Sequence, residues 1–562
     1  MRNISLGNKS MTPQRSAVPG RSDMIQNNAG GYGFETTLEE KVWRFIVMGS
    51  ESTYYGTSGS RTIATVASLE ELTKKNAKCV VDMAVHASLD NISPTNDYAL
   101  FVMAYVMSNG DISGRRYAAE RLNLVARTGT HLFNFVIYAQ ELRGWGKVMK
   151  RAISNWYTSK DPGKLAYQIC KYKERGGTIG NKKVSYSHRD LLRLSHVMDG
   201  NQERKDIYDY ITHKSGADAF LGYSSGSSII YAVEAIKSAS SESEVIGLIR
   251  DYKLTHEMVP NEWKDSPKVW AALLETMPIT ATIRNLAKMT TVGLLKPGAW
   301  DSIKIVRDRL TNMEALIKAR VHPISILKGF RTYASGHGYK GSGSWAPVPD
   351  ILEILESCLD LSFGTIKSTG KKYILGVDVS GSMSWAQSTY MAPLMPSEIA
   401  MTMAFATYKR EPNSIIIPFS SEVKKFDMSR FTSLDDMLNK TKKMTFGSTD
   451  VSLPIAYAIK EDIDVDIFSF YTDAETWVGN GHPYQWLEKY TEVKNINAGY
   501  IAVGINASHG FTLADPRNPR MVDIVGFDPG APRLISNIAE GKLNYRPEDM
   551  RMSGGAIQEE EE

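Results

Sequence analysis

The spacing of apolar residues changes its period once along this chain, and this change limits what the chain can fold into. From about Leu38 to Ser357, apolar residues recur every three or four positions in stretches of roughly 9 to 15 residues. Gly, Pro or Ser separates these stretches, and no strand-like alternation is sustained. Many short amphipathic helices joined by short links favour an α-solenoid, with a helical bundle as the alternative.

The last third of the sequence has a different pattern. Short runs rich in Ile and Val, such as YILGVDVS, SIIIPFS and AGYIAVGIN, alternate with helical runs such as SEIAMTMAFATYKR. Apolar strands that alternate with helices are typical of a doubly wound parallel sheet that is covered on both faces. We therefore predict an α-solenoid followed by an α/β doubly wound domain.

A chain of 562 residues is too long for a single core and should divide into domains. The N-terminal stretch is polar and has no apolar segment typical of a secretory signal, and the C-terminal stretch closes with EEEE. We predict a disordered arm over residues 1–30, a helical domain over 31–365, an α/β domain over 366–546, and an acidic tail over 547–562.

The composition narrows the class of protein. No apolar run reaches the roughly 18 to 20 residues that cross a bilayer, so we expect no membrane association. Cys79, Cys170 and Cys358 lie far apart and form no CxxC pair, which favours buried reduced thiols and a cytoplasmic location. The ten histidines have no zinc-binding spacing.

The charge is divided unequally between the two predicted domains. Residues 1–365 carry 46 Lys and Arg against 36 Asp and Glu, whereas the rest of the chain carries 20 against 26. The two halves therefore have net charges of opposite sign, which suggests that they have different tasks.

Oxygen-bearing side chains gather where predicted strands end. The stretch GVDVSGSM follows the first strand, FGSTDVSLP lies in a later loop, and FYTDAETW ends another strand. Ligands in such sheets bind at the carboxyl ends of the strands, and hydroxyls with one or two carboxylates suit a hard divalent cation. The alternative for DVSGS alone is a capped helix start. Together, the three segments favour a metal site that could also accept an acidic group from a partner.

This pattern resembles the metal-ion-dependent adhesion site of von Willebrand factor A domains. The resemblance implies that the cation is held by Asp378, Ser380, Ser382, Thr449 and Asp473, and Mg²⁺ is the expected ion. We find no group of carboxylates suited to two-metal cleavage of RNA, so we predict that the protein is not an enzyme.

A second candidate site lies in the helical half. Between Glu141 and Arg193 there are 13 Lys and Arg residues against 4 acidic residues. Aromatic residues are interleaved with them, at Trp145, Trp156, Tyr157, Tyr167, Tyr172 and Tyr186. Basic residues attract phosphates, and aromatic rings stack on unpaired bases, so this segment favours nucleic acid over a plain solvated surface.

Several long segments of the helical half, among them GWGKVMKRAISNWY, SHRDLLRLSH and HPISILKGFRTYASGHG, resemble the TROVE module of the Ro autoantigen family. GFTLADP and DIVGFDPGAP resemble the end of that family's A domain, so the resemblance covers nearly the whole chain. The segment ARTGTHLF and the glycine in VDVSGSM favour a bacterial or phage member.

The resemblance implies a monomeric ring of HEAT-like repeats closed by the A domain. It implies that Y RNA binds on the outer surface of the ring and that single-stranded 3′ ends of misfolded or structured RNA bind in its central cavity. It also implies a role in noncoding RNA quality control, with an exoribonuclease tethered through RNA. The implied outer-surface contacts are Lys171, Lys173, Arg175, His188 and Arg189, with Arg127 and His131 as further candidates.

Some of these positions have a second interpretation. A lone His188 is more often a helix cap or a core residue, although its place beside Arg189 at a helix start favours RNA. Arg127 and His131 could belong to an ordinary capped helix start, and GGTIGNKKVSY appears longer than the family's usual link. For the whole protein, the alternative is a metal-dependent protein-interaction scaffold that does not bind RNA directly.

Overall fold

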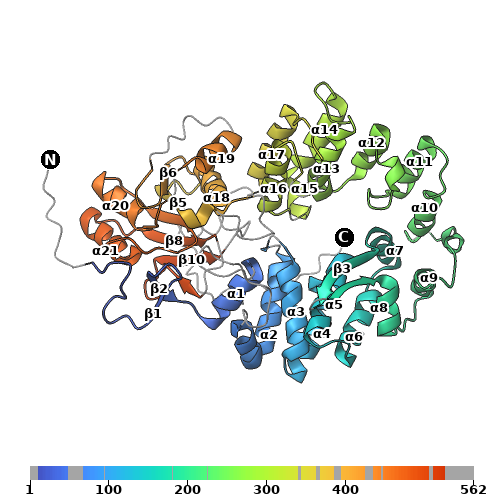
Figure 1. Ribbon diagram of the computed structural model, residues 1–562, viewed down its shortest axis with the longest axis horizontal. Helices are drawn as coiled ribbons and strands as arrows, with labels where there is room; N and C mark the ends of the chain where they lie inside the picture. Colours follow the sequence, from blue (N-terminus) through green and yellow to red (C-terminus); the bar gives the residue numbers. More distant parts are fainter. Residues whose placement is uncertain are drawn as a thin grey trace. The chain divides into compact units, whose positions relative to one another are not determined.

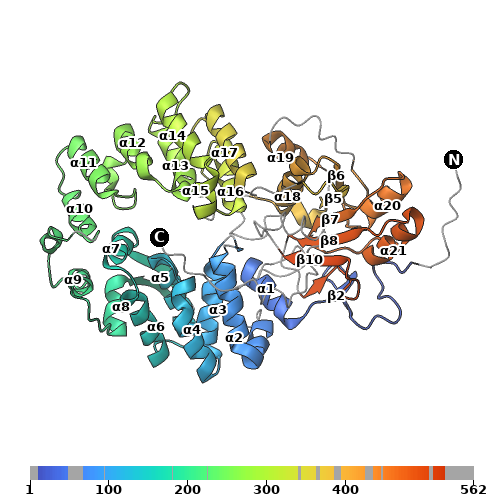
Figure 2. The same cartoon turned by 180° about the vertical axis from the view of Figure 1, so that it is seen from behind.

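The structure is a computed structural model of the full chain (Figures 1 and 2). It describes residues 11–48, 67–90, 92–93, 95–179, 182–223, 226–319, 321–338, 343–362, 368–384, 394–424, 434–444, 447–505 and 510–525. The chain divides into two compact units: a helical unit, Ala67–Ser362, and an α/β unit formed by Met1–Val66 and Phe363–Glu562. The predicted acidic tail, 547–562, lies outside the described residues. Within them, no helix is long and apolar enough to span a membrane.

The helical unit consists of helices of about two to six turns. They are α2 (Ala67–Leu89), α3 (Asp97–Asn109), α4 (Ile112–Val125), α5 (Gly129–Leu142), α6 (Lys147–Thr158), α7 (Pro162–Lys171), α8 (His188–Ser195), α9 (Gln202–Ile211), α10 (Ile229–Ala235), α11 (Glu242–Tyr252), α12 (Pro267–Thr276), α13 (Ile279–Thr291), α14 (Trp300–Leu310), α15 (Met313–Ala319), α16 (Pro323–Ala334) and α17 (Pro349–Ser362). Two short 3₁₀ helices lie between them, at Ala217–Phe220 and Asn261–Trp263.

Each helix packs mainly on helices that are close to it in the sequence. Helix α3 contacts α2, α4 and α5, helix α6 contacts α4 and α8, and helix α14 contacts α12, α13 and α17 (Figure 1). Many helix starts are capped by a side-chain oxygen that accepts a bond from a free backbone N–H, at Asp111, Thr128, Asp161, Ser187, Asn201, Ser241 and Ser266. This local packing confirms the predicted fold of repeated helices, although the unit begins at Ala67, whereas the predicted domain began at residue 31.

One strand pair interrupts the helices, and the sequence analysis did not predict it. Strands β3 (Glu174–Ile179) and β4 (Lys182–Ser187) pair antiparallel between α7 and α8. They occupy the GGTIGNKKVSY segment, and only Gly180 and Asn181 separate them, which is a usual hairpin spacing. The face of β3 that carries Gly177 packs against Ile137 of α5. The strands are too short and too exposed to give a clear apolar alternation.

The α/β unit is built on a five-stranded sheet with the order β10-β8-β7-β5-β6, in which every pair is parallel. The strands are β5 (Tyr373–Asp378), β6 (Ser414–Phe419), β7 (Ile467–Thr472), β8 (Gly499–Gly504) and β10 (Met521–Val525). The connecting helices are α18 (Pro396–Arg410), α19 (Leu434–Lys442), α20 (Leu453–Lys460) and α21 (Pro483–Lys494), with a 3₁₀ turn at Gly381–Ser384. Helices α18 and α19 pack together, as do α20 and α21. The predicted doubly wound sheet is confirmed.

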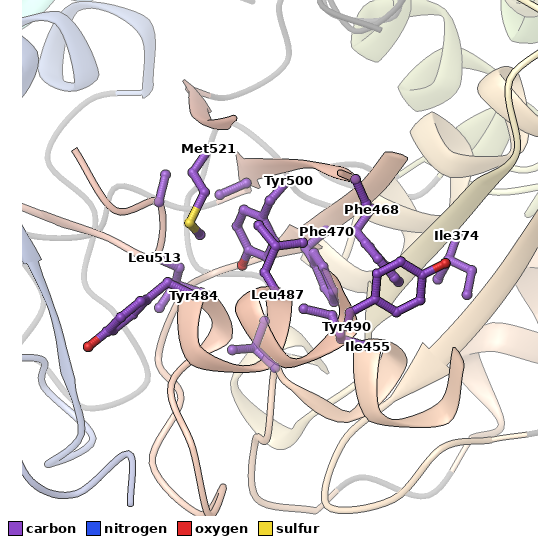
Figure 3. Close-up of a cluster of buried hydrophobic side chains, with 14 of the residues drawn as sticks. Ile374, Ile455, Phe468, Phe470, Tyr484, Leu487, Tyr490, Tyr500, Leu513 and Met521 are labelled. Carbon is purple, nitrogen blue, oxygen red and sulfur yellow. The ribbon is translucent and has the colours of Figure 1, made fainter. Parts of the chain in front are cut away.

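A dense apolar core lies between the sheet and helices α20 and α21 (Figure 3). Strands β5, β7 and β8 contribute Ile374, Phe468, Phe470 and Tyr500, and the helices contribute Ile455, Leu487 and Tyr490. A Cβ at Gly376 of β5 would meet the Phe470 ring of β7 at 2.7 Å and Pro454 of α20 at 3.2 Å, so glycine at this position leaves room for both side chains. The core holds the carboxyl ends of β5 and β7 in a fixed position.

The N-terminal arm, defined here as residues 11–35, is ordered, which corrects the prediction of disorder for residues 11–30, whereas residues 1–10 lie outside the described residues. Its strands β1 (Met24–Gln26) and β2 (Tyr32–Glu35) form a small antiparallel sheet with β9 (Phe511–Thr512). Met24 and Phe34 of the arm are part of the apolar core. Helix α1 (Leu38–Met48) follows and belongs to the α/β unit as well. The arm is held in place by contacts with residues more than 400 positions away in the sequence.

None of the three cysteines, all of which lie among the described residues, forms a disulfide. Cys170 and Cys358 are buried, whereas Cys79 is only half-buried. Burial raises the pKa of the Cys170 and Cys358 thiols to about 12 each, so both stay protonated at neutral pH.

Candidate functional site

The first candidate site lies where the strand order of the α/β sheet reverses. Strand β5 is paired with β6 on one side and with β7 on the other. The chain therefore runs from β5 to β6 at one edge of the sheet and then crosses back to β7 on the opposite side of β5. Asp378 is the last residue of β5, and Asp473 directly follows β7. The two carboxylates therefore meet at the switch point, which is where this fold places ligands.

Hydrogen bonds join the side chains at this switch point. Asp378 Oδ2 accepts a bond of 2.5 Å from the Thr472 hydroxyl, and its Oδ1 accepts one of 2.8 Å from the Ser380 N–H. The Ser380 and Ser382 hydroxyl oxygens are 3.2 Å apart, and the Ser382 side chain is hydrogen-bonded to Asp473. Four of the five predicted metal ligands are therefore connected by hydrogen bonds.

Thr449, the fifth predicted ligand, reaches the same place through its backbone. Its carbonyl oxygen accepts a bond of 3.1 Å from the N–H of Trp477, which lies on the segment that carries Asp473. In addition, the Gly381 N–H donates to the Gly447 carbonyl at 3.2 Å, which ties the Ser380–Ser382 turn to the Thr449 loop. Three segments far apart in the sequence thus form one site.

Two carboxylates are buried at this site, and burial disfavours their charged forms. Asp378 and Asp473 are 0% and 2% exposed. Burial, followed by repulsion from Asp473, raises the pKa of Asp378 to about 7, and burial also raises the pKa of Asp473. Nearby Glu475 is buried too, and its pKa is raised to about 7 by burial and by Asp473.

These residues fit a divalent cation. A cation would offset the repulsion between the two carboxylates, and the Ser380 and Ser382 hydroxyls add oxygens of the kind that Mg²⁺ prefers. In the part of the chain that the structure describes, no three His, Cys, Asp or Glu side chains group as a metal site. The candidate site has a different donor set: two carboxylates assisted by hydroxyls.

The second candidate site is the basic segment, defined as residues 141–193. It spans α6, α7, the β3–β4 hairpin and α8, all within the helical unit. Most of its cations face solvent: Arg143, Lys147, Arg151, Lys164, Lys173, Arg175, Lys182, Lys183 and Arg193 are exposed. This surface is strongly positive and can attract phosphate groups.

Two of its aromatic residues cannot stack on bases. Trp156 and Tyr157 are fully buried in the helical unit, whereas Tyr167, Tyr172 and Tyr186 remain half-buried. Lys171 is also turned inward, because its Nζ donates to the Tyr167 hydroxyl at 3.2 Å and its side chain is only 12% exposed.

His188 is a core residue, which corrects its prediction as an RNA contact. It is 3% exposed, its Nδ1 is 2.7 Å from the Tyr157 hydroxyl, and its ring packs on Phe133 and Trp156. Burial lowers its pKa to about 3, so the ring is neutral. Ser187 caps the start of this helix, and a capped helix start is usually exposed, so the local sequence did not indicate that the His188 side chain points inward.

The remaining predicted contacts are half-buried. Arg189 has part of its surface open, and its Nε is buried and finds no hydrogen-bond partner among the described residues. His131 is bonded to Asn96 at 3.3 Å, and burial together with Arg127 lowers its pKa to about 4. Arg127 is half-buried. Lys173 and Arg175 are thus the two predicted contacts that are exposed.

The arm residues that contact the loops of the candidate site were not predicted from the sequence. Gln14 is fully buried and contacts Asp450 and Thr476, and Asn28 donates to Glu475 Oε1 at 2.6 Å. The arm's polar composition is typical of a disordered segment, and nothing local in its sequence indicates these contacts.

Comparisons with known proteins match this architecture in both units. A family model described as the TROVE domain matches residues 25–330, and one described as the Ro60 vWA domain matches residues 372–539. A Deinococcus radiodurans relative named RNA-binding protein RO60 is 31% identical over an alignment of 523 residues, and the alignment covers 92% of this chain and 96% of the relative. A Caenorhabditis elegans relative of the same name is 29% identical, over 93% of this chain and 91% of the relative.

A solved structure agrees with these matches. The crystal structure of the Deinococcus radiodurans RO (RSR) protein aligns with a TM-score of 0.66 at 30% identity, and covers 90% of this chain and 100% of that chain. The resemblance seen in the sequence is therefore confirmed over both units, and the chain belongs to the Ro family, whose members join a TROVE domain to a Ro60-type von Willebrand factor A domain.

Proposed function

We propose that this protein binds RNA through its helical unit and is not an enzyme. The observation that carries the proposal is the exposed basic surface of the segment 141–193, which includes Lys173 and Arg175. Exposed cations bind the phosphate backbone by releasing counterions. Two relatives that align along nearly the whole chain carry the name RNA-binding protein, which supports the same reading.

We propose further that the RNAs are Y RNA and misfolded or structured noncoding RNA with single-stranded 3′ ends. The support is membership of the Ro family and the half-buried aromatic rings beside the cations, which suit unpaired bases. In this proposal the protein acts in RNA quality control, and an exoribonuclease is tethered through the bound RNA.

The α/β unit has a separate part in the proposal. Its switch-point residues would hold one divalent cation, with Mg²⁺ as the expected ion, through Asp378, Asp473 and the serine hydroxyls. A cation with few protein charges around it can accept an acidic group from a partner, so the site would serve for docking. The alternative is a protein-interaction scaffold that does not bind RNA. The RNA-binding experiment described next distinguishes this alternative from the proposal.

The test is RNA binding by the full chain carrying Lys173→Glu and Arg175→Glu. We expect the double variant to bind a structured RNA with a single-stranded 3′ tail at least tenfold more weakly in gel-shift assays. The slope of log affinity against log salt should fall by about 2, since each lost cation removes roughly one phosphate contact.

The matched control reverses the same amount of charge elsewhere on the helical unit, at Lys304 and Arg307 of α14, which are also exposed. This control should leave the salt slope within experimental error of the wild type. Wild-type protein that fails to shift the RNA at low salt would favour the scaffold alternative, and equal losses in both double variants would remove the basic segment from the site.

A further inference from the structure

The N-terminal arm lies directly over the loops that form the candidate metal site. Its residues bond to the segment 474–482, which follows Asp473: Asn27 donates to the Thr476 carbonyl at 2.8 Å, and the Gln14 N–H donates to the Gly479 carbonyl at 2.9 Å. The arm and these loops belong to the same compact unit. The site is therefore enclosed on one side by a segment from the other end of the chain.

Gln14 has the most contacts with the site loops. Its Nε2 donates to Asp450 Oδ1 and to the Gly481 carbonyl, each at 2.9 Å, while its Oε1 accepts from the Thr476 hydroxyl. Asp450 is next to Thr449, and Thr476 follows Asp473 by three residues. One side chain thus joins the loop that carries the hydroxyl ligand to the loop that carries the second carboxylate.

The surroundings leave Gln14 little room to move. It is 0% exposed, and Gly479 lies so close that a Cβ there would overlap both the Gln14 amide and the Asp450 carboxylate. Asp450 Oδ1 is also held by the Ser452 N–H at 3.0 Å and the Ser452 hydroxyl at 2.6 Å. An amide in this position suits the task because it donates to one loop and accepts from the other.

We infer that Gln14 is a positioning residue of the metal site, which holds the Thr449 loop and the Asp473 loop at the separation that the cation requires. This inference rests on the divalent-cation site proposed above. Groups that orient metal ligands through hydrogen bonds commonly change metal affinity by about 10- to 100-fold when they are removed.

The test is calorimetric titration of the full chain with Mn²⁺, used as the probe ion. Gln14→Leu keeps the size of the side chain and removes both bonding groups. Gly479→Ala keeps every arm side chain but displaces the Gln14 amide from Asp450, so it tests the same bond by a second route. We expect each variant to bind Mn²⁺ about tenfold more weakly than the wild type.

The control is Arg21→Gln on the same arm. Arg21 pairs with Asp515 at 2.6 Å and with Asp23 at 2.8 Å, and among the described residues it makes no hydrogen bond to the site loops. This variant should lower the melting temperature without metal but keep Mn²⁺ affinity within twofold of the wild type.

Three results would overturn the inference. If Gln14→Leu and Gly479→Ala bind Mn²⁺ like the wild type, Gln14 has no positioning role, and the metal site itself stands. If Arg21→Gln weakens Mn²⁺ binding as much as they do, any loosening of the arm is sufficient and Gln14 is not special. Wild-type protein that binds no Mn²⁺ would remove the metal site and the inference together.

Discussion

His188 is kept neutral by its surroundings, and this makes the stability of the helical unit depend on pH. The folded-state pKa is lowered to about 3, whereas an unfolded chain has the ordinary value of about 6.5. Between these values the unfolded chain binds a proton that the folded protein does not. Stability is therefore complete above about pH 6.5 and is lost as pH falls toward 3, by at most about 1.4 kcal/mol for each pH unit.

We predict that His188→Gln reduces this acid sensitivity. The variant should be about 1 to 3 kcal/mol less stable than the wild type at pH 7.5, because the bond to Tyr157 and the ring packing are lost. From pH 7.5 to 5.5 it should lose about 1 kcal/mol less stability than the wild type. Urea unfolding at both pH values measures the difference, and equal losses on acidification would contradict the buried neutral ring.

The same residue shows what single-residue patterns can predict. The capped start of α8 was predictable, because Ser187 and Asp190 have the spacing of a capping box. The burial of His188, Trp156 and Tyr157 was not, since it depends on how α6 and α8 pack together. Charge could be assigned from the sequence, but the inward or outward direction of each side chain could not.

At the scale of elements, the β3–β4 hairpin carries basic residues that we propose to bind RNA. One face of the hairpin packs on a helix and the other does not. A Cβ at Gly177 would meet Ile137 Cδ1 at 2.8 Å and Cγ2 at 3.2 Å, because this face of β3 packs on α5. A Cβ at the neighbouring Gly176 would meet only the Val184 carbonyl oxygen, at an ordinary distance of 3.6 Å. Gly177 thus faces helix α5, whereas the adjacent Gly176 faces open space.

We predict that Gly177→Val separates the hairpin from α5, at a cost of about 1 to 3 kcal/mol typical of overpacking. Gly176→Val is the matched control, and it should be neutral or slightly stabilising because Val favours strands. Hydrogen exchange of the β3 and β4 amides reports the result directly: faster exchange in Gly177→Val alone is expected. Equal protection in both variants would mean that the hairpin does not depend on its contact with α5.

Elements with local patterns were predictable, and those with distant partners were not. The strands of the parallel sheet are apolar runs bounded by polar loops, so their existence and the ligand-bearing ends of β5 and β7 followed from the sequence. The N-terminal arm has no such run. Its order depends on bonds such as Gln14 to Asp450, with partners 436 residues apart, which no local pattern contains.

At the scale of the whole molecule, the two units carry the two proposed activities on separate residues. The exposed cations lie on the helical unit, whereas the buried carboxylates, the serine hydroxyls and the arm that encloses them belong to the α/β unit. The net charges of the two units are also opposite, since residues 67–362 carry 39 Lys and Arg against 31 Asp and Glu, and the rest of the chain carries 27 against 31. RNA binding and metal binding should therefore respond to different substitutions.

We predict that Asp378→Asn abolishes metal binding but leaves RNA binding unchanged. With a chelator present, the variant should be at least as stable as the wild type, because one of two buried charges is removed. Mg²⁺ at about 100 times its dissociation constant should stabilise the wild type by about 2.7 kcal/mol and leave the variant unchanged. Its affinity for RNA, measured at the same Mg²⁺ concentration, should remain within twofold of the wild type.

The reciprocal variant completes the comparison. Lys173→Glu with Arg175→Glu should weaken RNA binding but retain the full shift in melting temperature on adding Mg²⁺, because neither residue is part of the α/β unit. Asp464→Asn, which removes an exposed carboxylate from the α/β unit, controls for the change in charge and should alter neither property. A loss of RNA affinity in Asp378→Asn but not in Asp464→Asn would show that the metal site acts on RNA, and the two activities would then have to be treated as one.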